Sequence, residues 1–531
     1  MTTKDNCFGR SGYLEVLSRR IRNFKDGYRQ NLAVIGDELI GKTSILFRML
    51  AGLDDNRLIM LYLEVRSEPL SSFAQRFIGV LLYNFLLNSG YPLKEDLDFL
   101  IKRSCGYIPH TVEKINAILA ALKKRKKNNI LSELFSLTEI IHQETGKSCV
   151  VILDEFHNLE GVGVKKVYRD WAKLLVLQKN TMYIIASSFK FKTKSLLSKE
   201  LSTLFGNFET VMIEPFDIKT SEAYLERCLS GAALTRGLKN FIIHLTGGYP
   251  FYLRLISEAV IKNTQSTLSD ILEDILFEPS GILNQRFSNY LKRFLDLPQS
   301  QDYISILYLV SSGHNRFNDI AAMLHKPKKD LRTRVNHLLG VDAVTRLGDF
   351  LKINDRVFAF WMRFVYQEKL NSLTFDAKNQ KAAFRDKISE MINEFIINSQ
   401  KPLIERLAEL LRLFENDTLQ IDNKRIRLTH FREIKPLEFN NRSLREGLIG
   451  RSGDGTWLLG LKQESITEDD ICAFARECKK YHKNLERKII LTSAEVDVNA
   501  RLRAMEEKIA TWDLDNINQL FDLFYKPRLI A

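Results

Sequence analysis

Short apolar runs alternate with helical patterns in the first half of the chain. Five runs have the length and the β-branched content of buried strands, namely Leu32–Ile35, Leu58–Glu64, Cys149–Leu153, Met182–Ala186 and Thr210–Ile213. Apolar residues at helical spacing precede the first run, follow it, and fill residues 70–146. Strands that alternate with helices usually lie parallel in one sheet. The pattern therefore predicts an α/β core built on a parallel sheet.

The first run leads into a phosphate-binding loop motif. Gly36-Asp-Glu-Leu-Ile-Gly41-Lys42-Thr43 fits G-x-x-x-x-G-K-S/T, and a helical pattern starts at its end. The glycines let backbone N–H groups converge on a phosphate, and the new helix directs its positive end there. Lys42 is expected on the β- and γ-phosphates and Thr43 on Mg²⁺. The candidate nucleotide-binding residues are Gly36, Asp37, Glu38, Leu39, Ile40, Gly41, Lys42, Thr43 and Ser44.

Two later strands end in polar residues. The run that ends at Leu153 is followed by Asp154 and Glu155. In a nucleotide site the first acid reaches Mg²⁺, and the second orients an attacking water. The fourth run ends in Ser187 and Ser188, and we take Ser187 as a candidate sensor of the γ-phosphate. An ordinary capping or turn serine explains the same residues equally well.

These motifs carry a family resemblance. Phe8-Gly9-Arg10, GDELIGKT, VVILDEFHNL, the SS strand end and TGGYPFYL resemble the prokaryotic "archaeal ATPase" family of STAND-type P-loop NTPases, relatives of AAA+ proteins and origin-recognition initiators. The resemblance implies a five-stranded core with a helical lid, and ATP as the nucleotide. It also implies that Phe8 and Arg10 lie near the adenine pocket and that TGGYP starts a lid helix. The initiators place an arginine sensor where this chain has Pro250, so that role is vacant.

Residues 299–370 predict a winged helix. Three helical segments, Ile304–Val310, Phe317–Leu324 and Lys328–Leu339, precede a hairpin about Gly348-Asp349. The third helix is basic and would enter the major groove of duplex DNA. Its candidate DNA contacts are Lys328, Lys329, Arg332 and Arg334. The competing interpretation is a module that binds protein.

The C-terminal residues 371–531 resemble a restriction-type PD-(D/E)xK nuclease in layout. An active member needs an acid on one strand and acid-x-Lys on the next. Alignment places Leu448 and Gly460 at the two acids, so only Lys462 and Glu405 remain. We therefore expect no nuclease activity. Compensation by Asp454 and Glu464 is the alternative, at the wrong spacing.

Composition adds a partner class to this picture. The 531 residues carry a formal net charge of +13, which favours a polyanion such as nucleic acid. No secretory signal or membrane-spanning run is evident, and the six cysteines form no zinc pattern, so a cytoplasmic protein with reduced thiols is expected.

The expected domains are a P-loop ATPase core (1–216), a helical lid and linker (217–298), a winged helix (299–370) and a degenerate nuclease-like domain (371–531). The predicted protein is an ATP- and Mg²⁺-dependent switch that hydrolyses ATP and is associated with DNA. A signalling or scaffold NTPase that forms homo-oligomers or binds protein partners is the second interpretation, and an active nuclease is the third.

Overall fold

The chain divides into two compact units. The computed structural model describes residues 7–53, 55–91, 94–124, 129–164, 167–201, 208–231, 234–371, 376–421, 424–439, 444–453, 455–481, 485–494 and 496–530. The first unit consists of Met1–Phe216 together with Tyr249–Phe251 and Gly340–Asp342. The second unit contains the remainder of the chain.

A five-stranded parallel sheet forms the centre of the first unit. Its strands are β1 (Asn31–Ile35), β2 (Leu58–Glu64), β3 (Ser148–Asp154), β4 (Thr181–Ser187) and β5 (Phe208–Met212), in the order β2-β3-β4-β1-β5. All five residues of β1 are buried, as expected for a strand covered on both faces. The predicted α/β core with a parallel sheet is confirmed. Because β4 lies between β1 and β3, the ends of these three strands are neighbours.

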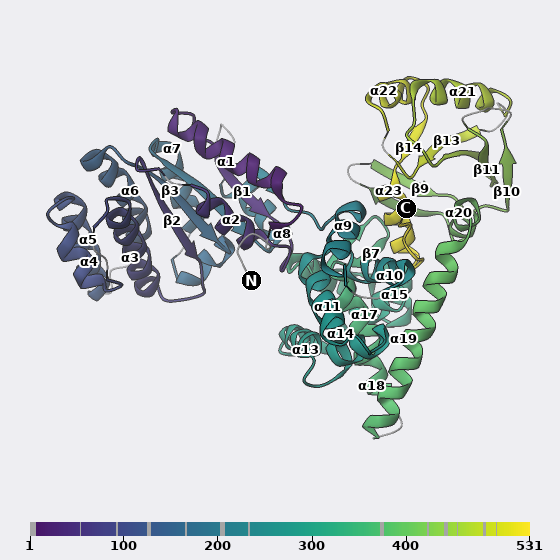
Figure 1. Cartoon of the computed structure of the whole chain (residues 1–531), viewed down its shortest axis with the longest axis horizontal. Coiled ribbons are helices and arrows are strands. Elements are labelled where there is room, and N and C mark those ends of the chain that lie inside the picture. The colour runs from purple at the N-terminus through teal and green to yellow at the C-terminus, as the bar shows by residue number, and fades with distance from the viewer. Residues whose placement is uncertain are drawn as a thin grey trace. The chain divides into compact units, whose positions relative to one another are not determined.

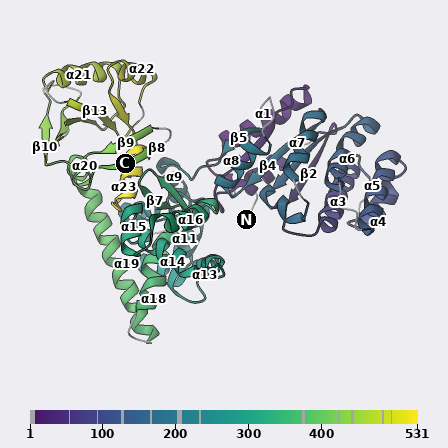
Figure 2. The ribbon, with the colours of Figure 1, turned by 180° about the vertical axis from the view of Figure 1, so that it is seen from behind.

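Helices surround this sheet. They are α1 (Ser11–Lys25), α2 (Lys42–Ala51), α3 (Leu70–Asn88), α4 (Leu97–Ser104), α5 (Pro109–Lys123), α6 (Ile130–Thr145), α7 (Val167–Leu177) and α8 (Lys190–Lys199), with the 3₁₀-helix η2 (Phe156–Val162) after β3. In Figures 1 and 2, α3 to α6 gather beside β2. Within the described residues, α3 is long and apolar enough to cross a membrane, but Phe73, Phe77 and Leu81 on it are fully buried in the core.

The second unit begins with helices. They are α9 (Ile218–Cys228), α10 (Arg236–Thr246), α11 (Pro250–Lys262), α12 (Leu268–Leu272), the π-helix η3 (Glu273–Phe277) and α13 (Ile282–Leu295). Next come α14 (Ser300–Ser311), α15 (Phe317–Met323) and α16 (Lys328–Gly340), then the hairpin of β6 (Val344–Leu347) and β7 (Phe350–Ile353). Three helices and a hairpin therefore form where the sequence predicts them, although α14 begins four residues before the predicted Ile304. After the hairpin follow α17 (Arg356–Trp361), the π-helix η4 (Met362–Tyr366), α18 (Gln367–Asn371) and the long helix α19 (Ala377–Gln400).

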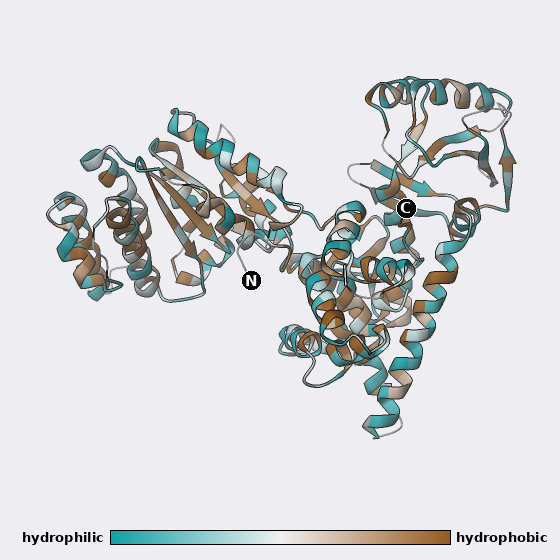
Figure 3. Ribbon diagram, viewed as in Figure 1, coloured by the Kyte–Doolittle hydropathy of each residue, from teal (hydrophilic) through white to brown (hydrophobic). Residues whose placement is uncertain are grey.

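A mixed sheet forms the centre of the C-terminal part. Strands β10 (Glu433–Glu438), β11 (Glu446–Arg451) and β12 (Thr456–Lys462) are antiparallel, and β13 (Leu485–Thr492) and β14 (Ala510–Trp512) continue in parallel. Helices α20 (Leu403–Leu411) and α23 (Leu514–Leu523) contribute to one hydrophobic core, and α21 (Glu468–Lys479) and α22 (Val498–Glu506) to another. Figure 3 shows apolar strands in the sheet of the first unit, mixed polar and apolar strands in the C-terminal sheet, and helices on which apolar and polar residues alternate.

A second hairpin packs against the first. It consists of β8 (Asp417–Ile421) and β9 (Lys424–Leu428). The amide of Asp349 donates to the carbonyl of Thr418 (2.9 Å), and the Asp349 carboxylate accepts from the amide of Thr418 (2.8 Å). A Cβ added at Gly348 would lie 2.2 Å from the Thr418 carbonyl oxygen. The turn between β6 and β7 is therefore covered by β8.

Candidate nucleotide-binding site

The loop between β1 and α2 has a backbone that its glycines allow. Gly41 has a φ of 101°, in the left-handed region that favours glycine. At Gly36 an added Cβ would lie 2.7 Å from the Ile213 carbonyl oxygen, so the loop passes too close to the end of β5 for any side chain. The first amides of α2 have no partners within the helix, and no described side chain caps them. The loop therefore presents free donors where an anion would bind.

Lys42 lies folded over this loop. Its buried ammonium donates to the carbonyl oxygens of Gly36 (3.1 Å) and Asp37 (3.0 Å) and to the Ser188 hydroxyl (2.9 Å). Burial lowers the pKa of Lys42, and the nearby carboxylate of Glu155, 3.9 Å from the ammonium, opposes that shift. The ammonium of Lys42 is thus held against the backbone of the loop at Gly36 and Asp37.

Thr43 and Asp154 meet as the motifs predict they would. The Thr43 hydroxyl donates to Oδ2 of Asp154 (2.7 Å), and so does the hydroxyl of Tyr62 (2.8 Å). The other oxygen of Asp154 accepts the amide of Glu155 (3.0 Å). A hydroxyl and a carboxylate in contact are the oxygen ligands that Mg²⁺ takes in such sites. This pair therefore fits a magnesium ion.

Ser188, rather than Ser187, lies between the acids and the lysine. The amide of Ser188 donates to Oε2 of Glu155 (3.1 Å), and its hydroxyl donates to Oε1. Ser187 is fully buried, and its hydroxyl contacts His157 Nδ1 (2.9 Å) and accepts from the amide of Phe189 (3.1 Å). The structure thus moves the contact expected of Ser187 one residue along the chain.

His157 was visible in the motif DEFHNL but received no role from the sequence. Its Nδ1 lies 3.3 Å from Oε2 of Glu155. Burial, together with the charges of Lys192 and Lys42, lowers the pKa of His157 to about 4. The imidazole is therefore neutral at pH 7, so it hydrogen-bonds Ser187 and lies beside Glu155 without adding charge.

Asp37 has partners that the sequence does not indicate. Its carboxylate is paired with Lys190 (2.8 Å) at the start of α8 and accepts the hydroxyl of Tyr249 (2.7 Å). Tyr249 belongs to the TGGYP motif, which precedes α11 at Pro250. The first unit thus includes a tyrosine, from far along the chain, bonded to the phosphate loop.

Phe8 and Arg10 lie beside the loop. The Arg10 guanidinium donates to the carbonyl oxygens of Glu214 (2.7 Å) and Ile40 (3.1 Å) and stacks 4.6 Å from the ring centroid of Phe216. The rings of Phe8 and Phe216 are 6.2 Å apart, edge to face. Arg10 therefore joins the phosphate loop to the residues after β5. Glu38 is exposed on the loop, and the Ser44 carbonyl accepts the thiol of Cys7 (3.4 Å).

The candidate DNA contacts differ in their surroundings. Lys328, Lys329 and Arg332 are exposed on the first turns of α16. Arg334 is half-buried and lies 3.4 Å from a carboxylate oxygen of Asp302. Three of the four residues therefore present their charge to solvent, and Arg334 is engaged within the protein.

The positions aligned with the nuclease acids are packed. Leu448 is 2% exposed in a hydrophobic core, and an added Cβ at Gly460 would lie 3.0 Å from the ring of Phe474. Lys462 pairs with buried Asp470 at 2.7 Å, an acid that also caps α21. Glu405 and Glu464 are exposed, and Asp454 lies outside the described residues. Among the described residues no group of three or more His, Cys, Asp or Glu is placed to hold a metal.

No protein-family model matches the chain, and no curated protein matches it. Among solved structures, the Walker-type ATPase PABY2304 of Pyrococcus abyssi is 19% identical, with 65% of this chain and 94% of that chain covered and a TM-score of 0.47. The Aeropyrum pernix ORC2 protein, in ADPNP and ADP complexes, is 11% identical over 68% and 95% of the chains (TM-score 0.40). The Aeropyrum pernix ORC1 protein in complex with DNA is 12% identical over 67% and 92% (TM-score 0.34). Similarities at this level do not assign the chain to a family.

Proposed function

We propose that this protein binds Mg²⁺ and ATP, hydrolyses the ATP, and acts as a nucleotide-dependent switch associated with duplex DNA in the cytoplasm. One observation carries the proposal: Lys42, the Thr43–Asp154 pair and the Glu155–Ser188 pair converge at the ends of three neighbouring strands. This is the set of groups that phosphoryl transfer from a nucleotide requires.

Different residues would bind the phosphates, hold the cation and orient the attacking water. The amides at the start of α2 and the Lys42 ammonium would bind the phosphates, while Thr43 and Asp154 would hold the cation. Bound Mg²⁺ supplies positive charge against the phosphate oxygens. Glu155 would orient the attacking water, and Ser188, which bonds both Glu155 and Lys42, would position the two groups relative to each other.

ATP hydrolysis and ATP binding test this proposal. We expect Glu155→Gln to lower the steady-state rate by about 100-fold or more with binding retained, because water orientation acts on the chemical step. Lys42→Ala should abolish measurable binding of ATP. Glu113→Gln, which removes an exposed carboxylate on α5, is the matched control and should leave both unchanged. Full hydrolysis by Glu155→Gln would refute the assignment.

The association with DNA rests on two groups of exposed basic residues. One is Lys328, Lys329 and Arg332 on α16. The other is Arg346 on β6 with Arg425 and Arg427 on β9, which lie where the two hairpins pack together. Because β8 covers the turn of the first hairpin, the second hairpin would stand in for the wing of a winged helix.

The same covered turn favours a second function. A turn that β8 covers is less accessible to a DNA groove, which leaves the alternative of a signalling or scaffold NTPase that binds protein partners or forms homo-oligomers. Hydrolysis that is stimulated by duplex DNA would support the first function. Hydrolysis indifferent to DNA, with nucleotide-dependent self-association, would support the second.

For the C-terminal part we propose a nuclease-like fold without nuclease activity. The tight packing at Gly460, where an added Cβ would lie 3.0 Å from the Phe474 ring, and the engagement of Lys462 by Asp470 support this proposal. Mg²⁺-dependent nicking of DNA that is lost in Lys462→Ala would contradict it.

A further inference from the structure

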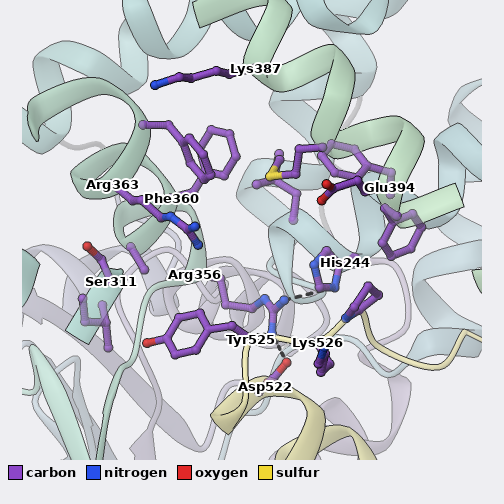
Figure 4. A pocket seen from close by; sticks show the side chains of 18 of the residues that line it. His244, Ser311, Arg356, Phe360, Arg363, Lys387, Glu394, Asp522, Tyr525 and Lys526 are labelled. Atoms are coloured by element: carbon purple, nitrogen blue, oxygen red, sulfur yellow. Dashed lines mark hydrogen bonds and ion pairs between the residues drawn. The ribbon is translucent and has the colours of Figure 1, made fainter. Parts of the chain in front are cut away.

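The second unit contains a cavity of about 630 Å³, and its lining includes none of the residues of the nucleotide site. Its walls come from α10, α17, η4, α19 and the segment after α23 (Figure 4). A volume of this size fits a ligand of roughly nucleotide dimensions. None of the candidate phosphate-binding or DNA-contacting residues lines this cavity, although Lys352 and Arg356 in its lining belong to the predicted winged-helix range 299–370.

Cations crowd the floor of the cavity. Asp522 is 2% exposed and is shared by Lys352 (2.9 Å), Arg528 (2.7 Å) and Arg356. Burial lowers the pKa of Lys352; attraction to Asp522 opposes this shift, and repulsion from Arg528 and Arg356 adds to it. Three cations around one carboxylate leave an excess of positive charge, which is costly in a buried place.

His244 does not change the net charge of the cluster around Asp522. Its Nδ1 accepts from the Arg356 guanidinium (3.2 Å) and lies 3.3 Å from the backbone amide of Arg528. A nitrogen that accepts in this way carries no proton, and burial keeps the pKa of His244 well below its usual value. The imidazole is therefore neutral.

Two arginines, Arg356 and Arg363, line the cavity and have N–H donors that could bind a ligand. Nε of Arg356 is buried without a hydrogen-bond partner among the described residues. Arg363, on the π-helix η4, extends toward Arg356 from another wall in Figure 4. Its guanidinium carbon lies 4.9 Å from the ring centroid of Phe364, and no ion pair joins it to a described carboxylate. Single π-helical turns are frequent at functional sites.

The remaining lining residues define the rest of a ligand. Three phenylalanine rings line the cavity: Phe360 and Phe364, whose centroids are 4.8 Å apart, and Phe395 of α19, which packs against His244. Glu368 is paired with Lys387 at the rim (2.7 Å), and Glu390 and Glu394 are exposed on α19. These three carboxylates line the cavity together with Asp522, and the Glu368 charge is offset by Lys387.

We propose that this cavity binds an organic phosphate, with the phosphate between Arg356 and Arg363 and the organic part against Phe360, Phe364 and Phe395. A phosphate monoester is a dianion, which matches the excess charge better than a single carboxylate does. Guanidinium groups bind phosphate oxygens in pairs of hydrogen bonds. The ligand would also contact Tyr525 and Lys526, and so would stabilise the C-terminal segment against α17 and η4.

Calorimetric titration of the full chain tests the proposal. The Lys42→Ala background removes nucleotide binding at the phosphate loop, so a failure of the ATP proposal cannot be mistaken for a failure here. The probes are AMP, ribose 5-phosphate, inorganic phosphate and uncharged adenosine. We expect AMP to bind with a Kd below about 1 mM and adenosine not to bind. Binding of ribose 5-phosphate as tight as that of AMP would place the recognition on the sugar phosphate instead of the base.

Substitutions locate the site. Arg363 is exposed, so Arg363→Gln should fold normally and weaken AMP binding by about 10-fold or more. Arg476→Gln, which removes an exposed arginine from α21, is the matched control and should change nothing. Arg356→Gln, provided that it folds, should weaken binding at least as much as Arg363→Gln. No binding of any phosphate at millimolar concentration, or binding unaffected by Arg363→Gln, would overturn the proposal.

Discussion

At the scale of single residues, the nucleotide site depends on which of two adjacent serines faces the acids. Ser187 is the last residue of β4 and pairs in register with Ile35, so its side chain is committed to the packed interior beside His157. Ser188 follows the strand and is placed over Glu155 and Lys42. The sequence shows that a polar residue ends this strand. It does not show where the strand ends, and a one-residue change reverses which side chain faces the site.

Alanine substitutions of the two serines test which of them acts in the nucleotide site. Ser188→Ala removes a hydrogen bond to a charged amine and one to a carboxylate, so we expect ATP hydrolysis to fall roughly 10- to 100-fold. Ser187→Ala should keep hydrolysis within about 3-fold and lower the free energy of unfolding by about 1 to 2 kcal/mol, because it removes the hydrogen bonds with His157 and with the amide of Phe189. Steady-state hydrolysis and urea unfolding measure the two effects. A larger catalytic loss in Ser187→Ala would restore the original assignment.

At the scale of elements, the hydrophobic patterns in the sequence predicted the helices and strands, because these depend mainly on neighbouring residues. The five strands of the core, the three helices of residues 299–370 and their hairpin all form within a few residues of the expected bounds. The docking of β8 on the turn at Gly348 was not predicted, because it joins residues 70 positions apart and depends on the missing side chain of Gly348. The pairing of Lys462 with Asp470 was not predicted for a similar reason. The sequence shows a lysine at a catalytic spacing, but it does not show which acid that lysine contacts.

The contact between the hairpins can be tested with two glycines that share a positive φ. Gly348 has a φ of 72° and no room for a Cβ, whereas Gly313 has a φ of 103° with its nearest neighbour at 3.8 Å. Gly313→Ala should therefore cost only the backbone strain, about 1 kcal/mol. Gly348→Ala should cost about 3 kcal/mol, because it also displaces β8. Unfolding in urea measures both, and equal losses would mean that the hairpins do not pack as described.

At the scale of the whole molecule, the question is whether its charge is directed at DNA. The net charge of +13 is spread over 531 residues, and part of the basic surface is paired, as Arg334 is with Asp302. Net charge alone therefore predicts only weak, salt-sensitive attraction to a polyanion. The two groups of exposed basic residues, on α16 and on the hairpins, give a more specific prediction than the net charge. They predict which residues contact phosphates and how many contacts each group makes.

Duplex binding measured against salt concentration decides this. The slope of log K against log salt is negative, and each phosphate contact that is lost reduces its magnitude by about 0.9. We expect the double variant Lys328→Ala with Arg332→Ala, and separately Arg425→Ala with Arg427→Ala, to reduce the magnitude of the slope by about 2 each. Arg476→Ala with Lys479→Ala removes the same charge from α21 and should reduce it by much less. If all three variants lose the same amount, the attraction is diffuse, and the protein-binding alternative gains support. If only the α16 variant differs from the control, the second hairpin does not act as a wing, although α16 still binds DNA.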